Sequence, residues 1–552
     1  MIYILLLFPS GGLPLQIVCP PDDSKQQYYR NSYMRYRRFW NLLIPVLVWW
    51  LGSSSYSYAQ YSMDYAVSMV GNAGNGTFAP YYFSANKHGL VTHSKSGYLR
   101  AALSRDIEMD KRFSYEFGVD LVGLLSSTSP VTYYDATQGV SQRRPQVSAF
   151  LIQQLYAGIK YRKIFISAGS RELTDPVVNF ELSSGGLVWS GNSRPIPQVR
   201  AGFIDFVDIP FTKGWVQIKG DLAYGKFMDD NFYKEHYNYY NHYITTGALY
   251  HHKSISFRTN PNKPFVVTIG AELAAQFGGT KHYYLKGVRI DSLTTKSPTR
   301  LKDFLQILFP SSGDGSTNVG DQAYYYGNHV GHWNLSAEYT FKNKSSVRGY
   351  FEWYYDDASG MGKLNGWDGL WGVEYKSGRQ NWLSDLVVEY VDFTNQGGPL
   401  NWCPTDYDNP QLTTEATGFD DYYNNYFYNG WMHYGLSNGT PMAKSPLYNT
   451  DGYMRYKYNR MRAVHLGAMG YIAPEWMYKV LASYRTSWGS MQLPLADTQH
   501  DLSGLIECRY TPVKLPGWTF SLSLTGDYGK LYGDKWGVSI GIKKSGILTI
   551  GK

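Results

Sequence analysis

No stretch of eighteen or more apolar residues occurs after residue 60 of this 552-residue chain. Because a membrane-spanning helix needs about 20 predominantly apolar residues, helical membrane spans are excluded for this part of the sequence. Charge is also scarce, since only 17% of the residues are Asp, Glu, Lys or Arg, against about a quarter in soluble globular proteins. The net charge of +8 includes no concentrated basic run, which argues against nucleic acid as a partner.

Cysteine and catalytic motifs are nearly absent. The three cysteines, Cys19, Cys403 and Cys508, lack the C-x-x-C and histidine spacings of metal and redox sites. If Cys19 is removed with an export leader, the other two either pair in an oxidising compartment or stay free. The chain has no G-x-S-x-G elbow, no H-E-x-x-H motif and no P-loop. The sequence therefore predicts a non-enzymatic protein without a cofactor or a metal ion.

Aromatic residues and glycine are abundant by contrast. The chain contains 51 Tyr, 16 Trp and 56 Gly, and 17% of its residues are aromatic. This composition is typical of transmembrane β-barrels, whose outer face meets the lipid through girdles of aromatic side chains. A soluble all-β protein, such as a large sandwich or propeller, is the alternative on composition alone.

Apolar and polar residues alternate in many segments, among them 113–121, 267–277, 333–341, 454–459 and 518–525. Because successive side chains of a strand point to opposite faces, each segment predicts a strand with one apolar and one polar face. Several segments have the roughly 9–11 residues that a tilted strand needs to cross a bilayer. Closure removes the unpaired edges that lipid cannot satisfy. The sequence predicts a closed antiparallel outer-membrane β-barrel of about 16–18 strands.

The N-terminus resembles an export signal that begins at Met34. Three arginines precede an apolar segment at 39–51, and the small-x-small pattern of a cleavage site ends at Ala59. This pattern predicts export to the outer membrane of a Gram-negative bacterium, with Bacteroidota as one candidate source. We interpret the chain as a mis-assigned start (1–33), a signal peptide (34–59) and the barrel (60–552).

Two local features depart from the strand pattern. In residues 300–310 the apolar side chains fall at helical spacing until Pro310, which predicts a short amphipathic helix on the periplasmic side of the barrel or in the lumen. A helical loop without functional consequence is the alternative. The pair His251–His252 could ligate a metal ion. Because neighbours on a strand face opposite sides, we expect one ring in the lumen and one outside, and a polar lumenal contact is favoured.

The segment 182–199, LSSGGLVWSGNSRPIPQV, resembles the signature of the Wzi family of capsule assembly proteins. Its most specific part is residues 192–197. Further similar segments occur in the family's order, one before it at 71–89 and the others after it at 205–230, 250–258, 303–315, 327–339 and 367–375. The resemblance implies an outer-membrane barrel of about eighteen strands that binds capsular polysaccharide or exopolysaccharide as a lectin. The chain departs from barrel assembly signals in ending GILTIGK, without a terminal aromatic residue.

Arg194 is the leading candidate for contact with this polysaccharide, because its planar fork suits a carboxylate such as that of a uronic acid. We add Asn192, Lys213 and His252 as polar lumenal contacts. Trp189 and Trp215 are expected to be stacking surfaces. The residues around Arg194 could instead fix a lumenal constriction or a barrel turn.

The expected partners are capsular polysaccharide or exopolysaccharide and the lipid and lipopolysaccharide of the outer membrane, and the expected state is a monomer. A porin or sugar-selective diffusion channel is the first alternative, because the sequence does not reveal whether the lumen is plugged. An outer-membrane hydrolase is the second alternative, although no pairing of a nucleophile with a base supports it.

Overall fold

The computed structural model describes residues 61–550 except 136–138, 145–147, 237–241, 319–320, 323–324, 357–359, 363–364, 397–400, 403–415, 418–419 and 450. The chain divides into a unit of Ser62–Leu548 and a second unit of Met1–Tyr61 with Thr549–Lys552, and the fold below is that of the first. The predicted start and signal peptide lie outside the described residues, and so does Cys403. No helix among the described residues is long and apolar enough to cross a membrane.

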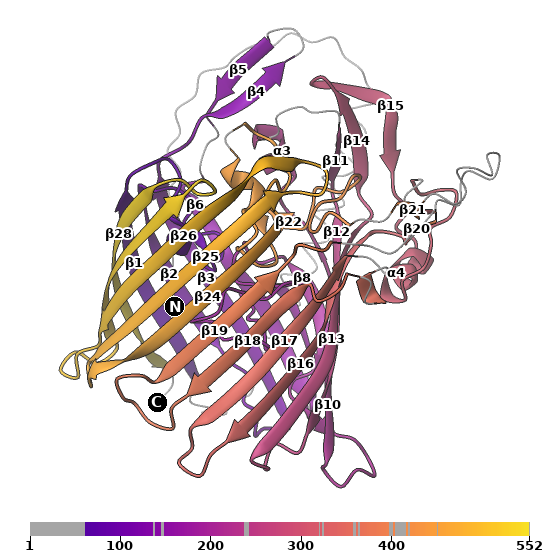
Figure 1. Ribbon diagram of the computed structural model, residues 1–552. Helices are drawn as coiled ribbons and strands as arrows, with labels where there is room; N and C mark the ends of the chain where they lie inside the picture. Colours follow the sequence, from indigo (N-terminus) through magenta and orange to yellow (C-terminus); the bar gives the residue numbers. More distant parts are fainter. Residues whose placement is uncertain are drawn as a thin grey trace, which may run out of the picture. The chain divides into compact units, whose positions relative to one another are not determined.

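Eighteen antiparallel strands form a closed barrel in which each strand pairs with its neighbours along the chain and the last pairs with the first (Figure 1). This confirms the predicted fold class. A short strand, β9 (Val207–Asp208), continues β8 against β10. The barrel strands are β1 (Tyr61–Gly74), β2 (Ser96–Arg105), β3 (Phe113–Ser126), β6 (Phe150–Tyr161), β7 (Ile164–Ser170), β8 (Gln198–Phe203), β10 (Val216–Lys226), β12 (Leu249–Thr259), β13 (Phe265–Phe277), β16 (Asn328–Thr340), β17 (Ser346–Asp356), β18 (Gly369–Lys376), β19 (Asp385–Asp392), β24 (Arg460–Ala473), β25 (Trp476–Gly489), β26 (Pro494–Tyr510), β27 (Trp518–Gly529) and β28 (Lys535–Ile550).

The two ends of the barrel differ in the length of their connections. One end carries short turns such as 260–264 and 341–345, whereas the other carries long connections such as 278–327 and 393–459. We call them the turn end and the loop end. In barrels of this class the short turns face the periplasm and the long loops face the cell exterior. The smaller elements of the long connections are α2 (Tyr81–Ser84), β4 (Val131–Asp135), β5 (Gly139–Arg143), α3 (Asp230–His236), β11 (His242–Thr246), β14 (Thr280–Leu285), β15 (Val288–Lys296), α4 (Leu301–Leu308), β20 (Asn401–Trp402), β21 (Ala416–Thr417), β22 (Met432–His433), β23 (Leu436–Ser437) and the 3₁₀ helix η1 (Pro446–Tyr448).

The barrel wall is apolar outside and polar inside. On β3, Glu116 and Asp120 are 5% and 1% exposed, whereas Val119 and Leu121 on the other face are 37% and 38% exposed. A water-soluble sandwich would bury the apolar face and expose the polar one. The reversed pattern fits a wall whose outer side chains face lipid and whose inner side chains need hydrogen-bonding partners.

Aromatic side chains gather at both ends of the outer wall. At the turn end, the Trp476 ring stacks on Tyr510 with ring centroids 4.5 Å apart. At the loop end, Trp353 stacks on Trp367 with a centroid separation of 5.3 Å. Aromatic rings with a polar edge favour the two membrane–water interfaces. The abundance of tryptophan and tyrosine is therefore accounted for in part by two girdles.

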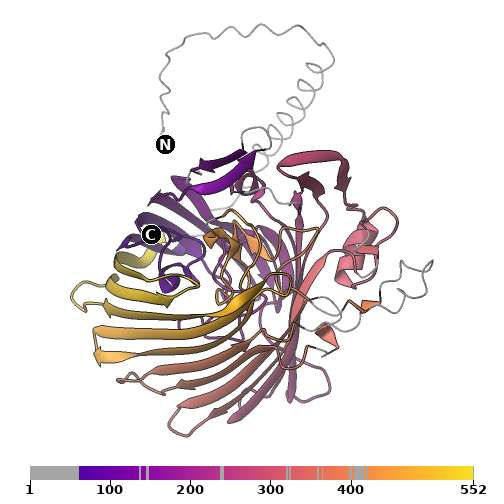
Figure 2. The same cartoon turned by 45° about the horizontal axis from the view of Figure 1, so that its top comes forward.

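Three connections from the loop end fold back into the barrel and fill it. We call their described residues within 78–94, 173–197 and 420–459 the plug; its last part is drawn in orange inside the ring of strands (Figure 2). Trp431, Tyr422 and Tyr423 of the plug are fully buried. Inward-facing polar groups of the wall bond to plug backbone, as where the amide of Ser184 donates to Glu389 Oε2 over 2.6 Å. The lumen is therefore occluded by the chain itself.

Helix α4 confirms the predicted helix at 300–310 but lies elsewhere than expected. It belongs to the connection between β13 and β16, at the loop end and not at the turn end. Its Phe304 ring packs 5.2 Å from the rings of Tyr224 and Phe277, which face outward from β10 and β13. The Lys253 ammonium, also outward-facing, donates to the carbonyls of Ile307 and Leu308 at the helix C-terminus. The helix thus lies against the outer wall, because the plug already occupies the lumen.

The expected strand at 454–459 is also incorrect. Met454 and Tyr456 are buried in the plug, and β24 begins only at Arg460. Alternation at this site reflects one side of an extended segment packed inside the lumen, which gives the same periodicity as a lipid-facing strand. Cys508 forms no disulfide with any described residue, and its pairing with Cys403 falls outside the described residues.

Candidate functional site

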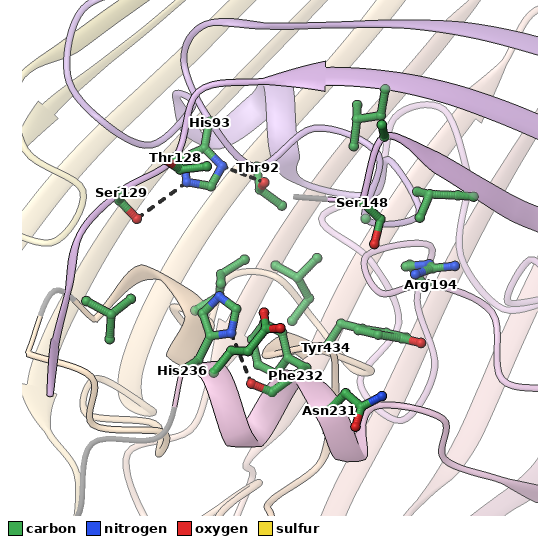
Figure 3. A pocket seen from close by; sticks show the side chains of 18 of the residues that line it. Thr92, His93, Thr128, Ser129, Ser148, Arg194, Asn231, Phe232, His236 and Tyr434 are labelled. Atoms are coloured by element: carbon green, nitrogen blue, oxygen red, sulfur yellow. Dashed lines mark hydrogen bonds between the residues drawn. The ribbon is translucent and has the colours of Figure 1, made fainter. Parts of the chain in front are cut away.

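The candidate site is a cavity of about 650 Å³ at the loop end, between the plug, α3 and the connection from β3 to β6 (Figure 3). Its volume falls within the range of about 300–1,000 Å³ that is usual for small-molecule sites. The polar and aromatic side chains that line it are Thr92, His93, Thr128, Ser129, Ser148, Arg194, Asn231, Phe232, Glu235, His236 and Tyr434.

Arg194 supplies a fixed positive charge to this cavity. Its guanidinium lies 4.5 Å from the centroid of the Tyr434 ring, and no ion pair of Arg194 occurs in the described part of the chain. Its Nε is buried and lacks a hydrogen-bond partner. Burial lowers the pKa of Arg194, although a guanidinium keeps its proton at neutral pH. An anionic ligand would therefore find an unpaired, partly desolvated cation here.

The local sequence around Arg194 fixes its position. Pro195 and Pro197 have no backbone N–H to satisfy, and their carbonyls accept hydrogen bonds from Ser170 Oγ over 3.1 Å and from the Lys226 amide over 3.1 Å. A Cβ at Gly89 would lie only 2.8 Å from Cγ of Arg194. Glycine at this position therefore leaves room for the arginine side chain beside the cavity.

Tyr434 is presented by a tight hairpin between β22 and β23. The turn consists of Tyr434 and Gly435, whose φ angles are 53° and 73°. Two positive φ angles are typical of a type I′ turn, and a tyrosine at the first of them is strained. The backbone N–H of Tyr434 donates to Asp229 Oδ2 over 2.9 Å, and its hydroxyl donates to the Met228 carbonyl over 2.9 Å. These bonds hold the ring beside Arg194.

The other walls of the cavity carry rings and small hydroxyl groups. On α3, the Phe232 and His236 rings stack with centroids 3.9 Å apart. On the opposite side, His93 lies within hydrogen-bond distance of Ser129 Oγ at 3.4 Å. Burial lowers the pKa of both His93 and His236 to about 4. Both rings are therefore uncharged at neutral pH, and Arg194 is the main cation of the cavity.

The structure brings three of the six predicted residues into one plug segment. Trp189 is buried with its ring 6.0 Å from that of Tyr250. Asn192 is buried and donates from Nδ2 to the Ser437 carbonyl over 3.1 Å. Of this segment, only Arg194 lines the cavity. Trp189 and Asn192 are 8% and 2% exposed and lie behind the cavity, where their contacts position the segment that carries Arg194.

The remaining three predicted residues lie elsewhere. His252 faces the lumen from β12, with Nε2 2.9 Å from Glu272 Oε1 and Nδ1 3.2 Å from Asp221 Oδ1, while His251 faces outward and lies 3.1 Å from the Ala223 carbonyl. The expected division of the histidine pair is confirmed. Lys213 and Trp215 belong to the turn between β9 and β10 at the turn end and do not share a site with Arg194.

Sequence reasoning missed most of the cavity. Tyr434, Phe232 and His236 lie in loop segments that are rich in tyrosine or contain no recognisable motif, so the sequence did not indicate a role for them. A histidine–tyrosine–glycine run at 433–435 was the one available signal for a hairpin turn, because glycine there permits a positive φ. A second group of buried ligand-type residues lies in the lumen: Asp175, His332 and Glu352.

Comparisons with known proteins identify the fold. The structure resembles Wzi of Escherichia coli, described as an outer-membrane protein involved in group 1 capsule assembly and a carbohydrate-binding β-barrel, with a TM-score of 0.50, 12% identity and coverage of 87% of this chain and 83% of that one. It also matches OccAB2 of Acinetobacter baumannii (TM-score 0.45, 7% identity, 90% and 100% covered). A third match is OprD of Pseudomonas aeruginosa (TM-score 0.40, 10% identity, 91% and 98% covered). No family model and no curated protein matches the sequence. The chain therefore has the fold of a bacterial outer-membrane β-barrel.

Proposed function

We propose that this chain is a non-enzymatic outer-membrane lectin of the Wzi type that holds an acidic capsular polysaccharide or exopolysaccharide at the cell surface. The observation that carries the proposal is the unpaired Arg194 guanidinium, stacked on Tyr434 in a cavity of about 650 Å³ at the loop end. The loop end faces the cell exterior in this class of barrel, which is where a surface polysaccharide is held.

The chemistry of the cavity supports a sugar acid as the ligand. The planar fork of Arg194 matches the two oxygens of a uronate carboxylate. The faces of Tyr434 and Phe232 offer apolar surfaces for the C–H face of a sugar ring. Ser129 and Asn231 offer hydrogen-bonding groups for hydroxyls.

The filled lumen favours this function over the alternative of an open diffusion channel. A porin needs an aqueous path along the barrel, whereas the plug of this chain packs fully buried aromatic residues such as Trp431 across it. A single sugar contact would be weak, and a polymer that engages many copies of the protein gains avidity from repetition.

Binding of the source strain's surface polysaccharide to the full-length protein in nanodiscs tests the proposal. We expect Arg194→Gln to weaken binding about 10- to 140-fold, because a charge-assisted hydrogen bond contributes about 1.5–3 kcal/mol. Tyr434→Asn should weaken binding as well, because asparagine tolerates the positive φ but lacks the ring. Lys213→Gln is the matched control at the turn end and should leave the affinity unchanged.

Chemical reduction of the polysaccharide carboxylates should lower the affinity for the wild type to that for the Arg194→Gln variant. A deletion strain should release polysaccharide of normal length into the medium. Equal binding by the wild type and the Arg194→Gln variant, or a large steady current through the wild-type protein in planar bilayers, would refute the lectin proposal.

A further inference from the structure

We propose that the lumen of this barrel holds a divalent transition-metal ion bound by Asp175, His332 and Glu352. Their ligand atoms lie within 4.8 Å of one another. The proposal does not depend on the lectin function, and it replaces the expectation from the sequence that the chain holds no metal. The ion would join the plug to the barrel wall, because Asp175 belongs to the plug while the other two residues belong to strands.

The three residues come from distant parts of the chain. His332 on β16 and Glu352 on β17 both face the lumen, and the ladder pairs His332 with Tyr354 and Asn334 with Glu352. The two ligands are thus diagonal neighbours on one face of a strand pair, within reach of each other. Asp175 approaches them from the connection between β7 and β8.

Each proposed ligand atom is buried, and only His332 Nε2 has an ion-pair contact in the described part of the chain, with Glu272 Oε2 at 3.4 Å. Asp175, His332 and Glu352 are 6%, 0% and 0% exposed. Asp175 Oδ2, His332 Nε2 and Glu352 Oε1 have no hydrogen-bond partner. A buried polar atom without a partner is costly, and three such atoms in one cluster point to a shared ligand.

The second oxygen of each carboxylate is held by plug backbone. The Val177 amide donates to Asp175 Oδ1 over 2.7 Å, and the Leu187 amide donates to Glu352 Oε2 over 2.7 Å. Each carboxylate therefore presents one free oxygen in a fixed direction, as ligands oriented by outer partners do. Asn334 Nδ2 lies 3.4 Å from His332 Nδ1. A 180° rotation of this amide would turn its oxygen toward the ring, where it accepts a hydrogen bond from Nδ1–H and leaves Nε2 as the metal ligand.

The charges around the cluster leave a place for a dication. Asp175 and Glu352 form no ion pair in the described part of the chain. Two ionised carboxylates and one neutral imidazole carry a charge of about −2, so a buried cluster of this kind needs about two positive charges for neutrality. The nearby cations are engaged by other carboxylates: Arg200 by Asp221 at 2.6 Å, and His252 by Asp221 at 3.2 Å and by Glu272 at 2.9 Å. His332 Nε2 lies 3.4 Å from Glu272 Oε2.

One imidazole with two carboxylates suits Zn²⁺ or Mn²⁺ better than Ca²⁺, which prefers oxygen ligands alone. Ligand atoms around Zn²⁺ are about 3.4 Å apart in a tetrahedron, so the cluster must contract by roughly 1 Å on binding. Asp175 can move because it lies on a connection and not on a strand. Gly186 provides the space, since a Cβ there would collide with Asp175 Oδ2.

The metal content of the full-length protein tests the proposal. We expect protein purified in detergent without chelator to contain a single Zn²⁺ or Mn²⁺ per chain by mass spectrometry. His332→Gln and Glu352→Gln should lose the ion. His329→Gln should retain it, because His329 is equally buried on the same strand but bonds to the Tyr326 carbonyl and is outside the cluster.

Titration of the metal-free protein with ZnCl₂ and with MnCl₂ gives a second measurement. Saturable binding and a rise in the unfolding temperature are expected for the wild type, and an affinity at least about 100-fold weaker for either ligand variant. Migration of the unheated protein on SDS gels reports whether each variant is folded. A folded wild type with background metal and no response to either salt would overturn the site, and would indicate that Asp175 and Glu352 share a proton instead. Polysaccharide binding is measured in parallel, so that failure of the metal site and failure of the lectin function are distinguished.

Discussion

Replacing Glu389 with glutamine should loosen the plug while the barrel stays folded. Glu389 faces the lumen from β19 and is 1% exposed. Its Oε1 accepts hydrogen bonds from Ser183 Oγ over 2.7 Å and from the Tyr350 hydroxyl. Its Oε2 accepts from the Ser184 amide over 2.6 Å. One wall carboxylate therefore holds two consecutive plug residues.

The size of the effect follows from these contacts. Glutamine keeps one oxygen for Ser183 and Tyr350 but turns an NH₂ group toward the Ser184 N–H, so that a donor faces a donor. The loss of one charge-assisted hydrogen bond and the unsatisfied amide cost about 2–3 kcal/mol together. If the substitution destabilises the closed plug by this amount and leaves the opened state unchanged, the population of the opened state rises about 30- to 140-fold.

Ion conductance in planar bilayers measures this opening. The wild type should show rare brief openings, and Glu389→Gln should show them more often by about the factor above. Glu338→Gln is the matched control, because Glu338 is also a lumenal carboxylate but bonds to no plug residue in the described part of the chain. A variant that is folded on SDS gels and conducts no more than the wild type would refute the reasoning. So would a wild type that already carries a steady large current.

Four other consequences of the structure can be tested. Arg485→Met should lower the free energy of unfolding by about 3–5 kcal/mol, because it leaves the buried Asp501, now 2.7 Å from the guanidinium, without its cation; urea unfolding in detergent checks this. The affinity for an acidic polysaccharide should be flat between about pH 5.5 and 8, because His93 and His236, whose pKa burial lowers to about 4, stay neutral there; tighter binding on acidification to pH 5.5 would contradict it. For the same two groups the unfolded chain takes up protons below about pH 6.5 while the folded chain does not, so stability should fall from about pH 6.5 toward 4. Val464→Arg should lower the free energy of unfolding by about 2–4 kcal/mol, because Val464 is 51% exposed on the outer wall and a charged side chain there would enter lipid. Unfolding measured in bilayers checks this value, with Val464→Leu as the control.

The barrel could be predicted from local sequence because strand periodicity is a local property. The alternation in 113–121 places Glu116 and Asp120 on one face and Val119 and Leu121 on the other, whatever the rest of the chain does. The structure confirms both faces, with the apolar one outward. The helix near 301–308 was predictable for the same reason, since spacing along one segment sets its amphipathic face. The side of the barrel on which that helix lies was not.

The candidate site could be predicted only in part. Arg194 was identified by its guanidinium and its neighbouring prolines, and it lines the cavity. Its neighbour Tyr434 is distant in sequence, and nothing in either segment indicates the other. Lys213 and Trp215 were expected to join Arg194 as a polar lumenal contact and a stacking surface, yet strand β8 carries the chain to the opposite end of the barrel before it reaches them.

Local sequence patterns were enough to predict the strands, their lipid-facing side and the lack of catalytic motifs, because these depend on residues a few positions apart. The filled lumen could be recognised only in the folded molecule. Plug residues such as Tyr456 alternate as a strand does, and they are buried only because the barrel closes around the plug. The same holds for the cluster of Asp175, His332 and Glu352, since closure of the barrel is what brings one wall and one connection together. Such long-range contacts form when the free energy gained by burial exceeds the entropic cost of closing the loops between them. Because this balance depends on the whole chain, it cannot be derived from any short segment.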